Sequence, residues 1–296
     1  MAIALTVFGY AAYRLYGIMQ DYREADRQYA DVREHYTSPS GNTATQEDKP
    51  VLSPKYEDAE APLVPDWDGL KAANQDIVGW IYVDARPDIS YPICYRKDDD
   101  DYYLHRSYTG EYLYAGAIFL EGYNNPDFSD PVSILYGHNM KNGSMFAQLK
   151  DLIDQDTYDA NPYFWILTPG GNYRYKIFSV FQTDPESDVY TLISKNGEEL
   201  LHYGETMKAK SAVSNDTDLY EDDRYVVLST CVSDHVHRTV VIGRCVSSTQ
   251  PVKTTDDPAA WTTETGDVYV DESGAAEEET VPVSGQVTDP FGIEGF

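Results

Sequence analysis

The sequence predicts a mainly β protein built around a closed or nearly closed barrel of eight strands. The first observation is a set of eight short runs rich in β-branched and aromatic residues, separated by glycine, proline, asparagine and aspartate. The second is the abundance of tyrosine, with 26 residues in a chain of 296, because tyrosine favours strands. The third is a hydrophobic share of 42%, which is enough to bury a sizeable core.

The eight predicted strands follow one another along one stretch of the chain. They cover residues 78–83, 89–95, 115–121, 132–137, 163–168, 173–182, 224–230 and 238–246. Three helical segments accompany them: residues 67–75 lead in, residues 144–152 follow the fourth strand, and residues 192–210 form a helical insertion between strands 6 and 7. Because long insertions between strands are uncommon and often functional, we expect this one to border a binding site.

The segments outside the barrel have a different composition. We expect residues 1–19, apolar apart from Arg14, to form a membrane anchor, complete or truncated, with a buried or interfacial helix as the alternative. The composition of residues 20–65 predicts a charged helical stalk followed by a linker. Together with residues 1–19, the stalk makes up a predicted N-terminal helical region. We expect residues 66–250 to form the folded domain. Residues 251–296 carry eleven acidic residues and one lysine, and predict an acidic disordered tail.

Charge and cysteine content exclude several classes of function. The formal net charge of −28, with no basic stripe, argues against nucleic-acid binding. The three cysteines form no CxxC pair or Cys/His cluster, so neither a disulfide scaffold nor a structural zinc site is predicted. Cys94 and Cys245 lie in apolar runs and read as core residues, whereas Cys231 has polar neighbours that favour a chemical role.

Three polar residues lie where predicted strands end or begin. His138 follows the fourth strand in ILYGHNM, Cys231 follows the seventh in VVLSTC, and Arg238 opens the eighth. A thiolate attacks carbonyls, an imidazolium stabilises the thiolate and protonates a leaving amine, and a guanidinium can stabilise an oxyanion. By contrast, His105 and His202 lie outside any catalytic pattern. The spacing alone is weak evidence, since such a trio also occurs by chance.

Several motifs resemble those of a known family. YGHNMKNGSMF (136–146), LSTC (228–231) and the following Arg238 resemble the signatures of sortases, in the same order. NQDIVGWI (74–81), YPI (91–93), DYYL (101–104), GAIFLE (116–121) and NNPDFSD (124–130) are similar to the class B subgroup. The resemblance spans roughly residues 67–246 and implies a sortase-like barrel whose catalytic domain is 66–250.

The resemblance also implies roles for individual residues. It implies that Cys231 is the nucleophile, His138 the general acid and base, and Arg238 the group that binds the oxyanion or positions the substrate. It further implies a substrate-binding groove that includes Ser229, Tyr190, Leu104 and Thr183. It implies no metal ion and no organic cofactor.

The implied function is that of a cell-surface cysteine transpeptidase of Gram-positive bacteria. Such an enzyme cleaves a C-terminal sorting motif of a secreted protein after a threonine, through a thioacyl intermediate, and transfers the protein to an amine of a cell-wall precursor or a pilin. It is expected at the cell membrane, with a single-pass N-terminal anchor and an extracellular catalytic domain. Two alternatives stay open: a hydrolytic cysteine peptidase at the cell surface, and a non-enzymatic adhesion or assembly barrel.

Overall fold

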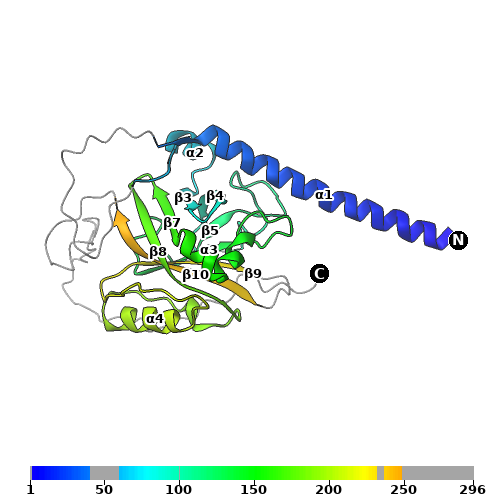
Figure 1. Cartoon of the computed structure of the whole chain (residues 1–296). Coiled ribbons are helices and arrows are strands. Elements are labelled where there is room, and N and C mark those ends of the chain that lie inside the picture. Colours follow the sequence, from blue (N-terminus) through cyan, green and yellow to red (C-terminus); the bar gives the residue numbers. More distant parts are fainter. Residues whose placement is uncertain (1, 41–59, 100, 232–236, 249–296) are drawn as a thin grey trace, which may run out of the picture.

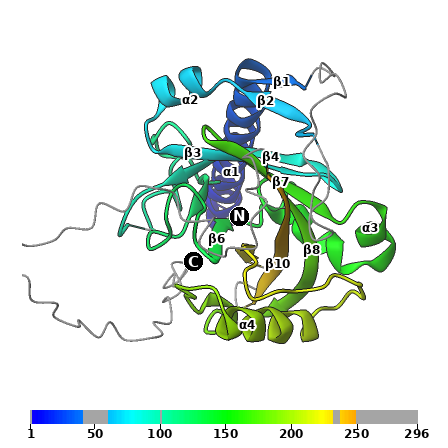
Figure 2. The same cartoon turned by 90° about the vertical axis from the view of Figure 1, so that its left-hand side faces the viewer.

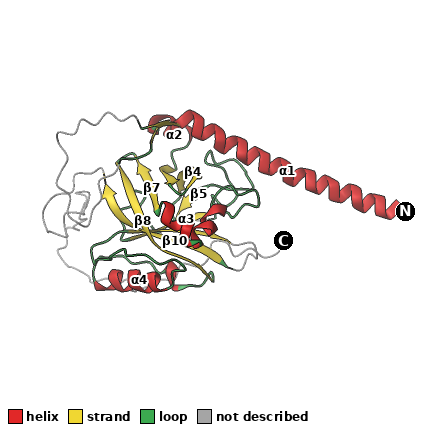
Figure 3. Cartoon of the chain, in the orientation of Figure 1, coloured by secondary structure: helices red, strands yellow, loops and turns green. Residues whose placement is uncertain are grey.

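The core of the protein is a closed barrel of eight strands. The structure, a computed structural model, describes residues 2–40, 60–99, 101–231 and 237–248. Neighbouring strands around the barrel run in the order β10-β8-β7-β3-β4-β5-β6-β9, and Figures 1 and 3 show them at the centre of the molecule. Their bounds are β3 Ile77–Val83, β4 Arg86–Tyr95, β5 Ile118–Leu120, β6 Val132–Gly137, β7 Tyr163–Thr168, β8 Gly171–Thr183, β9 Tyr225–Cys231 and β10 Arg238–Ser248. The predicted mainly β fold and its eight strands are confirmed.

The strands that end near the predicted chemistry are the most deeply buried. Every residue of β6 is buried, and β10 is buried at all but its last position. Strands buried on both faces read as continuous apolar runs, as VSILYG and TVVIG do. β6 pairs in parallel with β9, and β9 pairs antiparallel with β10. Burial on both faces therefore fixes the ends of these strands relative to one another.

The helices lie outside the barrel. The lead-in segment forms α2 (Trp67–Ala73), and the segment after β6 forms a 3-10 helix, η1 (Ala147–Ile153), followed by α3 (Gln155–Ala160). The predicted helical insertion between strands 6 and 7 is confirmed: α4 (Glu198–Ala209) lies within the predicted bounds, and a short 3-10 helix, η2 (Asp188–Tyr190), precedes it. Figures 1 and 2 show α4 on the side of the barrel away from α2.

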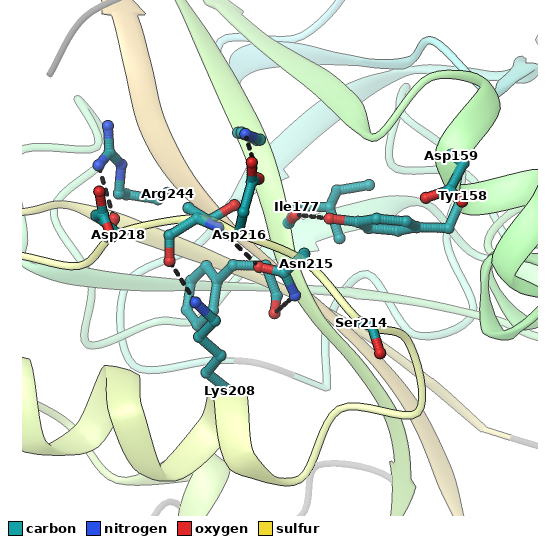
Figure 4. Close-up of polar contacts among 12 residues, drawn as sticks. Tyr158, Asp159, Ile177, Lys208, Ser214, Asn215, Asp216, Asp218 and Arg244 are labelled. Atoms are coloured by element: carbon teal, nitrogen blue, oxygen red, sulfur yellow. Dashed lines mark hydrogen bonds and ion pairs between the residues drawn. The ribbon is translucent and has the colours of Figure 1, made fainter. Parts of the chain in front are cut away.

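Polar contacts fix the insertion against the barrel (Figure 4). The side-chain amide of Asn215 donates to the carbonyl oxygen of Phe178 in β8 over 2.8 Å, and Arg244 of β10 donates to the carbonyl of Asp218 over 2.8 Å. On the helical side, the ammonium of Lys208 donates to the carbonyl of Thr217. Backbone carbonyls of the returning chain are thus paired, so α4 and the chain that follows it are held in a defined place on the barrel.

The N-terminal segment forms one long helix, α1 (Ala2–Tyr36), that packs on the barrel through its C-terminal half. Ala25, Tyr29 and Val32 are buried there, and the Tyr29 hydroxyl donates to the carbonyl of Gly116 over 2.5 Å. The predicted stalk is therefore helical, but one of its faces is part of the core rather than solvated. The first half of α1 extends away from the barrel in Figure 1.

The predicted linker begins and ends in a small sheet. β1 (Thr37–Pro39) pairs antiparallel with β2 (Leu63–Pro65), so the two ends of the linker lie side by side. Residues 41–59 of the linker and the predicted acidic tail at 251–296 lie outside the described residues.

The expected membrane anchor and the membrane localisation built on it are wrong. Within the described part of the chain, no helix contains a stretch both long enough and apolar enough to cross a membrane. The physical reason is that the apolar run of α1 also contains Arg14 and three tyrosines, Tyr10, Tyr13 and Tyr16, whose polar groups lower its mean hydropathy.

The packing of α1 can be tested through Tyr29. Tyr29→Ala should lower the free energy of unfolding by about 3–5 kcal/mol, because it removes a buried aromatic ring and its hydrogen bond. Tyr13→Ala, at a position 74% exposed on the same helix, should change it by less than about 0.5 kcal/mol. Urea unfolding of the full chain measures both values. Equal stabilities for the two variants would contradict the docking of α1.

Candidate active site

The predicted site residues meet at one end of four neighbouring strands. Arg238 at the start of β10 lies opposite Cys231 on β9 and opposite Thr183 on β8. Gly137, the last residue of β6, lies opposite Thr230 of β9 in parallel register. The next residues along the two chains are His138, just past β6, and Cys231, at the end of β9. Neighbouring strands lie about 4.8 Å apart. The register thus brings residues separated by up to 100 positions into one row.

Hydrogen bonding fixes the tautomer of His138. Its Nε2 lies 2.8 Å from the carbonyl oxygen of Leu104. A carbonyl oxygen can only accept a hydrogen bond, so Nε2 carries a proton, and Nδ1 is the nitrogen whose protonation can change. Leu104 therefore contacts the predicted acid and base through its main chain. The structure thus brings the predicted groove residue Leu104 into contact with the predicted catalytic histidine His138.

Close approach of the chain to Leu104 requires a glycine. Gly116 has a φ of +59°, and a β-carbon there would lie 2.3 Å from the carbonyl oxygen of Leu104. Any other residue would clash with the carbonyl that binds His138. The glycine thus preserves the geometry around the imidazole.

Arg238 is almost completely inside the protein. Only 2% of the residue is exposed, although arginine is rarely buried to this extent. Its backbone is paired on both sides, with β8 and β9, so the base of the side chain is held rigidly. A guanidinium stays charged in proteins and presents several donors in a fixed plane. Arg238 therefore supplies an immobilised positive charge at the end of the strand row.

Ser229 and Tyr190 are hydrogen-bonded to each other. Their hydroxyl oxygens lie 2.8 Å apart, and both residues are buried. Tyr190 belongs to η2, so this bond ties the helical insertion to β9, two residues before Cys231. Both predicted groove residues therefore form a buried wall beside the end of β9, with most of their surface covered.

A second buried pair, missed by the sequence analysis, supports this wall. The Tyr136 ring stacks on Tyr190, with centroids 6.4 Å apart, and its hydroxyl donates to Glu121 over 2.9 Å. Glu121 has no exposed surface. An acidic residue at the end of the apolar run GAIFLE was the available signal, because a carboxylate is rarely buried without a specific partner.

His105, predicted to lie outside any catalytic pattern, contacts the predicted catalytic histidine. Its ring stacks on that of His138, with centroids 5.4 Å apart and an angle of 19° between the planes. It also faces a hollow of about 320 Å³ next to the site, lined by Asp99, Asp101, Tyr102, His105, Arg106 and Tyr112. The sequence analysis had no signal for this contact, since the two histidines are 33 positions apart in the chain.

The three cysteines differ in their surroundings. Cys94 and Cys245 are free thiols in the core, and burial raises the pKa of each thiol above its usual range. Buried thiols of this kind are unreactive because the thiolate is disfavoured. For Cys231, the last residue of β9, the structure describes the backbone.

Comparison with known proteins identifies the family. The Sortase domain model matches residues 88–246, which is more than half of the chain and includes every predicted site residue. The chain belongs to the sortase family. Sortases are cysteine transpeptidases, so the protein is an enzyme of that type, and the non-enzymatic alternative is excluded.

Relatives of this sortase are class B enzymes. Sortase B from Listeria monocytogenes is 36% identical over 183 residues, which cover 60% of this chain and 73% of the relative. The crystal structure of sortase B from B. anthracis in complex with AAEK1 matches with a TM-score of 0.63 and 30% identity, over 77% of this chain and 99% of that one. Sortase B from Staphylococcus aureus matches with a TM-score of 0.57 and 26% identity, over 62% and 87%. The resemblance to class B is confirmed.

The bond between Tyr190 and Ser229 can be measured by a double-mutant cycle. Tyr190→Phe and Ser229→Ala should each lower the free energy of unfolding by about 1–3 kcal/mol, because each leaves a buried hydroxyl without its partner. The double variant should lose about 1 kcal/mol less than the sum of the two.

A matched cycle serves as the control. Tyr158→Phe removes another buried bond, from a tyrosine hydroxyl to the carbonyl of Ile177, and its effect should add to that of Ser229→Ala. Additive effects in the cycle of Tyr190 with Ser229 would contradict a direct bond between insertion and strand.

Proposed function

We propose that this sortase cleaves a C-terminal sorting motif of secreted proteins after a threonine and transfers the protein to an amine, through a thioester on Cys231. The observation that carries the proposal is the strand register, in which Arg238 is opposite Cys231 and His138 follows the pairing of β6 with β9. A nucleophile, an acid–base group and a donor that can stabilise an oxyanion are together sufficient for acyl transfer by cysteine, and a buried guanidinium can be that donor.

The first half-reaction forms the thioester. The Cys231 thiolate attacks the carbonyl carbon of the threonine, and the carbonyl oxygen becomes an oxyanion. When that intermediate collapses, the bond between the carbonyl carbon and the amide nitrogen breaks, and the proton on His138 Nδ1 passes to the departing amine. The hydrogen bond from Nε2 to Leu104 supports this assignment, because it leaves Nδ1 as the nitrogen that exchanges protons.

The second half-reaction resolves the thioester. An incoming amine attacks the same carbonyl carbon and gives up a proton to the neutral His138. The new amide bond forms as the Cys231 thiolate leaves, so thiolate and imidazolium are both regenerated. The proposed amine belongs to a cell-wall precursor or to a pilin lysine. Water in place of the amine would give hydrolysis.

We assign Arg238 to the oxyanion or to the substrate carbonyl beside it. Its burial and its position between Thr183 and Cys231 support this role, because a donor held in a water-poor place costs little reorganisation during the reaction. Ser229, Tyr190, Leu104 and Thr183 are assigned to the substrate groove. Since Ser229 and Tyr190 are bonded to each other, their role is to shape its wall.

Product analysis tests the proposed reaction. Purified enzyme is incubated with a panel of sorting peptides, with and without an amine acceptor, and products are identified by mass spectrometry. Cleavage after threonine, with amide products when the amine is present, supports transfer. Carboxylate products alone at saturating amine would favour the hydrolytic peptidase, and full activity of Cys231→Ala would refute the proposal.

Thiol labelling should distinguish the cysteines. Iodoacetamide should modify native protein once, at Cys231, because burial raises the pKa of the Cys94 and Cys245 thiols and shields them from the reagent. Peptide mapping after brief exposure measures this. After unfolding in urea, all three cysteines should react. Rapid labelling of Cys94 or Cys245 in the native protein, with Cys231 unmodified, is the contrary result.

Substitution of Arg238 separates geometry from charge. Arg238→Lys keeps the charge but replaces a planar fork by a single flexible ammonium. If Arg238 binds the oxyanion, we expect Arg238→Lys to lower the transfer rate by about 10²–10³, nearly as much as Arg238→Ala. Steady-state rates with one accepted peptide measure both variants. A near-normal rate for Arg238→Lys would contradict the oxyanion role, and a near-normal rate for Arg238→Ala would remove Arg238 from the site.

A further inference from the structure

Two consecutive residues hold the imidazole of His138. At the ring edge, Nε2 of His138 donates a hydrogen bond to the carbonyl oxygen of Leu104 over 2.8 Å. His105 lies against the face of the ring, with 5.4 Å between the two ring centroids. A hydrogen bond at one edge leaves the ring free to tilt about that bond, whereas a flat neighbour against the face opposes the tilt. Together the two contacts define both the position and the plane of the ring.

His105 is itself held in place by Tyr114. The two rings are nearly parallel, at 17°, with centroids 6.0 Å apart, and His105 Nδ1 lies 3.3 Å from the carbonyl oxygen of Tyr114. Tyr114 in turn contacts the ring of Tyr22 in α1 at 6.3 Å. The ring stack of Tyr114, His105 and His138 is thus connected to the N-terminal helix.

The backbone around His105 is closed into a firm turn. The carbonyl of His105 accepts the N–H of Leu113 over 3.0 Å, and the carbonyl of Tyr103 accepts the N–H of Ala117 over 3.0 Å. These two bonds join the stretch that contains Leu104 and His105 to the stretch that contains Tyr114. The segment that carries the stack is therefore cross-linked by backbone hydrogen bonds, and it is joined to α1 by the bond between Tyr29 and Gly116.

We propose that His105 is a positioning residue, which holds the His138 imidazole in the plane needed for proton transfer by stacking on it between Tyr114 and His138. The proposal rests on the proposed role of His138 as acid and base. Stacking, rather than the chemistry of the His105 nitrogens, carries the effect.

Two substitutions of His105 test this. His105→Phe keeps a flat ring and loses the bond to Tyr114, so we expect kcat within about threefold of the wild type. His105→Ala removes the ring, and kcat should fall by about 10–100-fold, with KM for the peptide unchanged, because a small misplacement of a catalytic group has effects of this size. Peptide transfer assays measure both. Wild-type kcat in His105→Ala, or a loss in His105→Phe as large as in His105→Ala, would overturn the proposal.

Tyr114 and Tyr112 provide a matched pair of substitutions that tests the stack without changing His105. Tyr114→Leu removes the ring that supports His105, and should lower kcat about tenfold. Tyr112→Leu changes a tyrosine that is 72% exposed and lines the hollow, and should leave kcat unchanged. Equal losses in the two variants would count against stacking as the cause.

A spectroscopic readout separates this proposal from the proposed function. The Nε2 proton of His138, protected by its bond to Leu104, should give a resolved imidazole resonance in ¹⁵N-labelled protein, assigned by its loss in His138→Gln. The resonance should persist in His105→Phe and broaden or disappear in His105→Ala. If no peptide is transferred by the wild type, the proposed function fails, while this spectrum still decides the stack. An unchanged resonance in His105→Ala would overturn it.

Discussion

The parallel pairing of β6 with β9, Gly137 opposite Thr230, is the constraint on which the site depends. Parallel neighbours cannot be joined by a tight turn, so the chain between them forms η1, α3, β7, β8 and the helical insertion before it returns. A slip of one residue would turn each side chain of β9 to the other face of the sheet. Because β6 and the described residues of β9 are buried on both faces, such a slip would exchange the side chains inside the barrel with those packed outside it and disrupt both layers of packing. The packing energy of the barrel thus fixes where the chemistry occurs.

The strand row is supported from behind by a layer of buried polar contacts. Tyr190 is bonded to Ser229, and Tyr136 stacks on Tyr190 and is bonded to Glu121. Hydrogen bonds of this kind add only modest net stability, but leaving one partner buried and unpaired is costly. Such a layer therefore disfavours alternative arrangements of the wall more than it stabilises the fold as a whole. This is what a site needs when it must hold groups within a fraction of an ångström.

The barrel could be predicted because its strands are locally coded. Runs such as VSILYG and YFWILT combine β-branched and aromatic residues with clear breaks, and all eight appear in the structure within a few residues of their expected bounds. The order of His138, Cys231 and Arg238 at strand ends was likewise readable, although their alignment in one row required the register. The packed face of α1 was missed because its few buried residues, Ala25, Tyr29 and Val32, are spread along a helix that is otherwise rich in charged residues. The contact of His105 with His138 joins different segments, and no local pattern reveals it.

The anchor prediction was wrong for a related reason. It weighed the apolar residues of 1–19 and gave too little weight to Arg14 and the tyrosines among them. The stretch is part of the continuous helix α1, whose later turns pack on the barrel. Through Tyr22 and Tyr29, α1 thus contacts the segment that carries Leu104 and His105. The N-terminal helix is therefore connected to the site through the folded core.

Trapping of the acyl-enzyme tests the central claim, that the strand row forms an acyl-transfer site at Cys231, most directly. Wild-type protein is mixed with an accepted sorting peptide in the absence of amine, quenched in acid within the first turnover, and measured by intact mass and peptide mapping. The account predicts that the protein gains the mass of the peptide up to its threonine, on Cys231, and loses it when amine is added before the quench. Cleavage that proceeds with no adduct, or with an adduct on another residue, would contradict it.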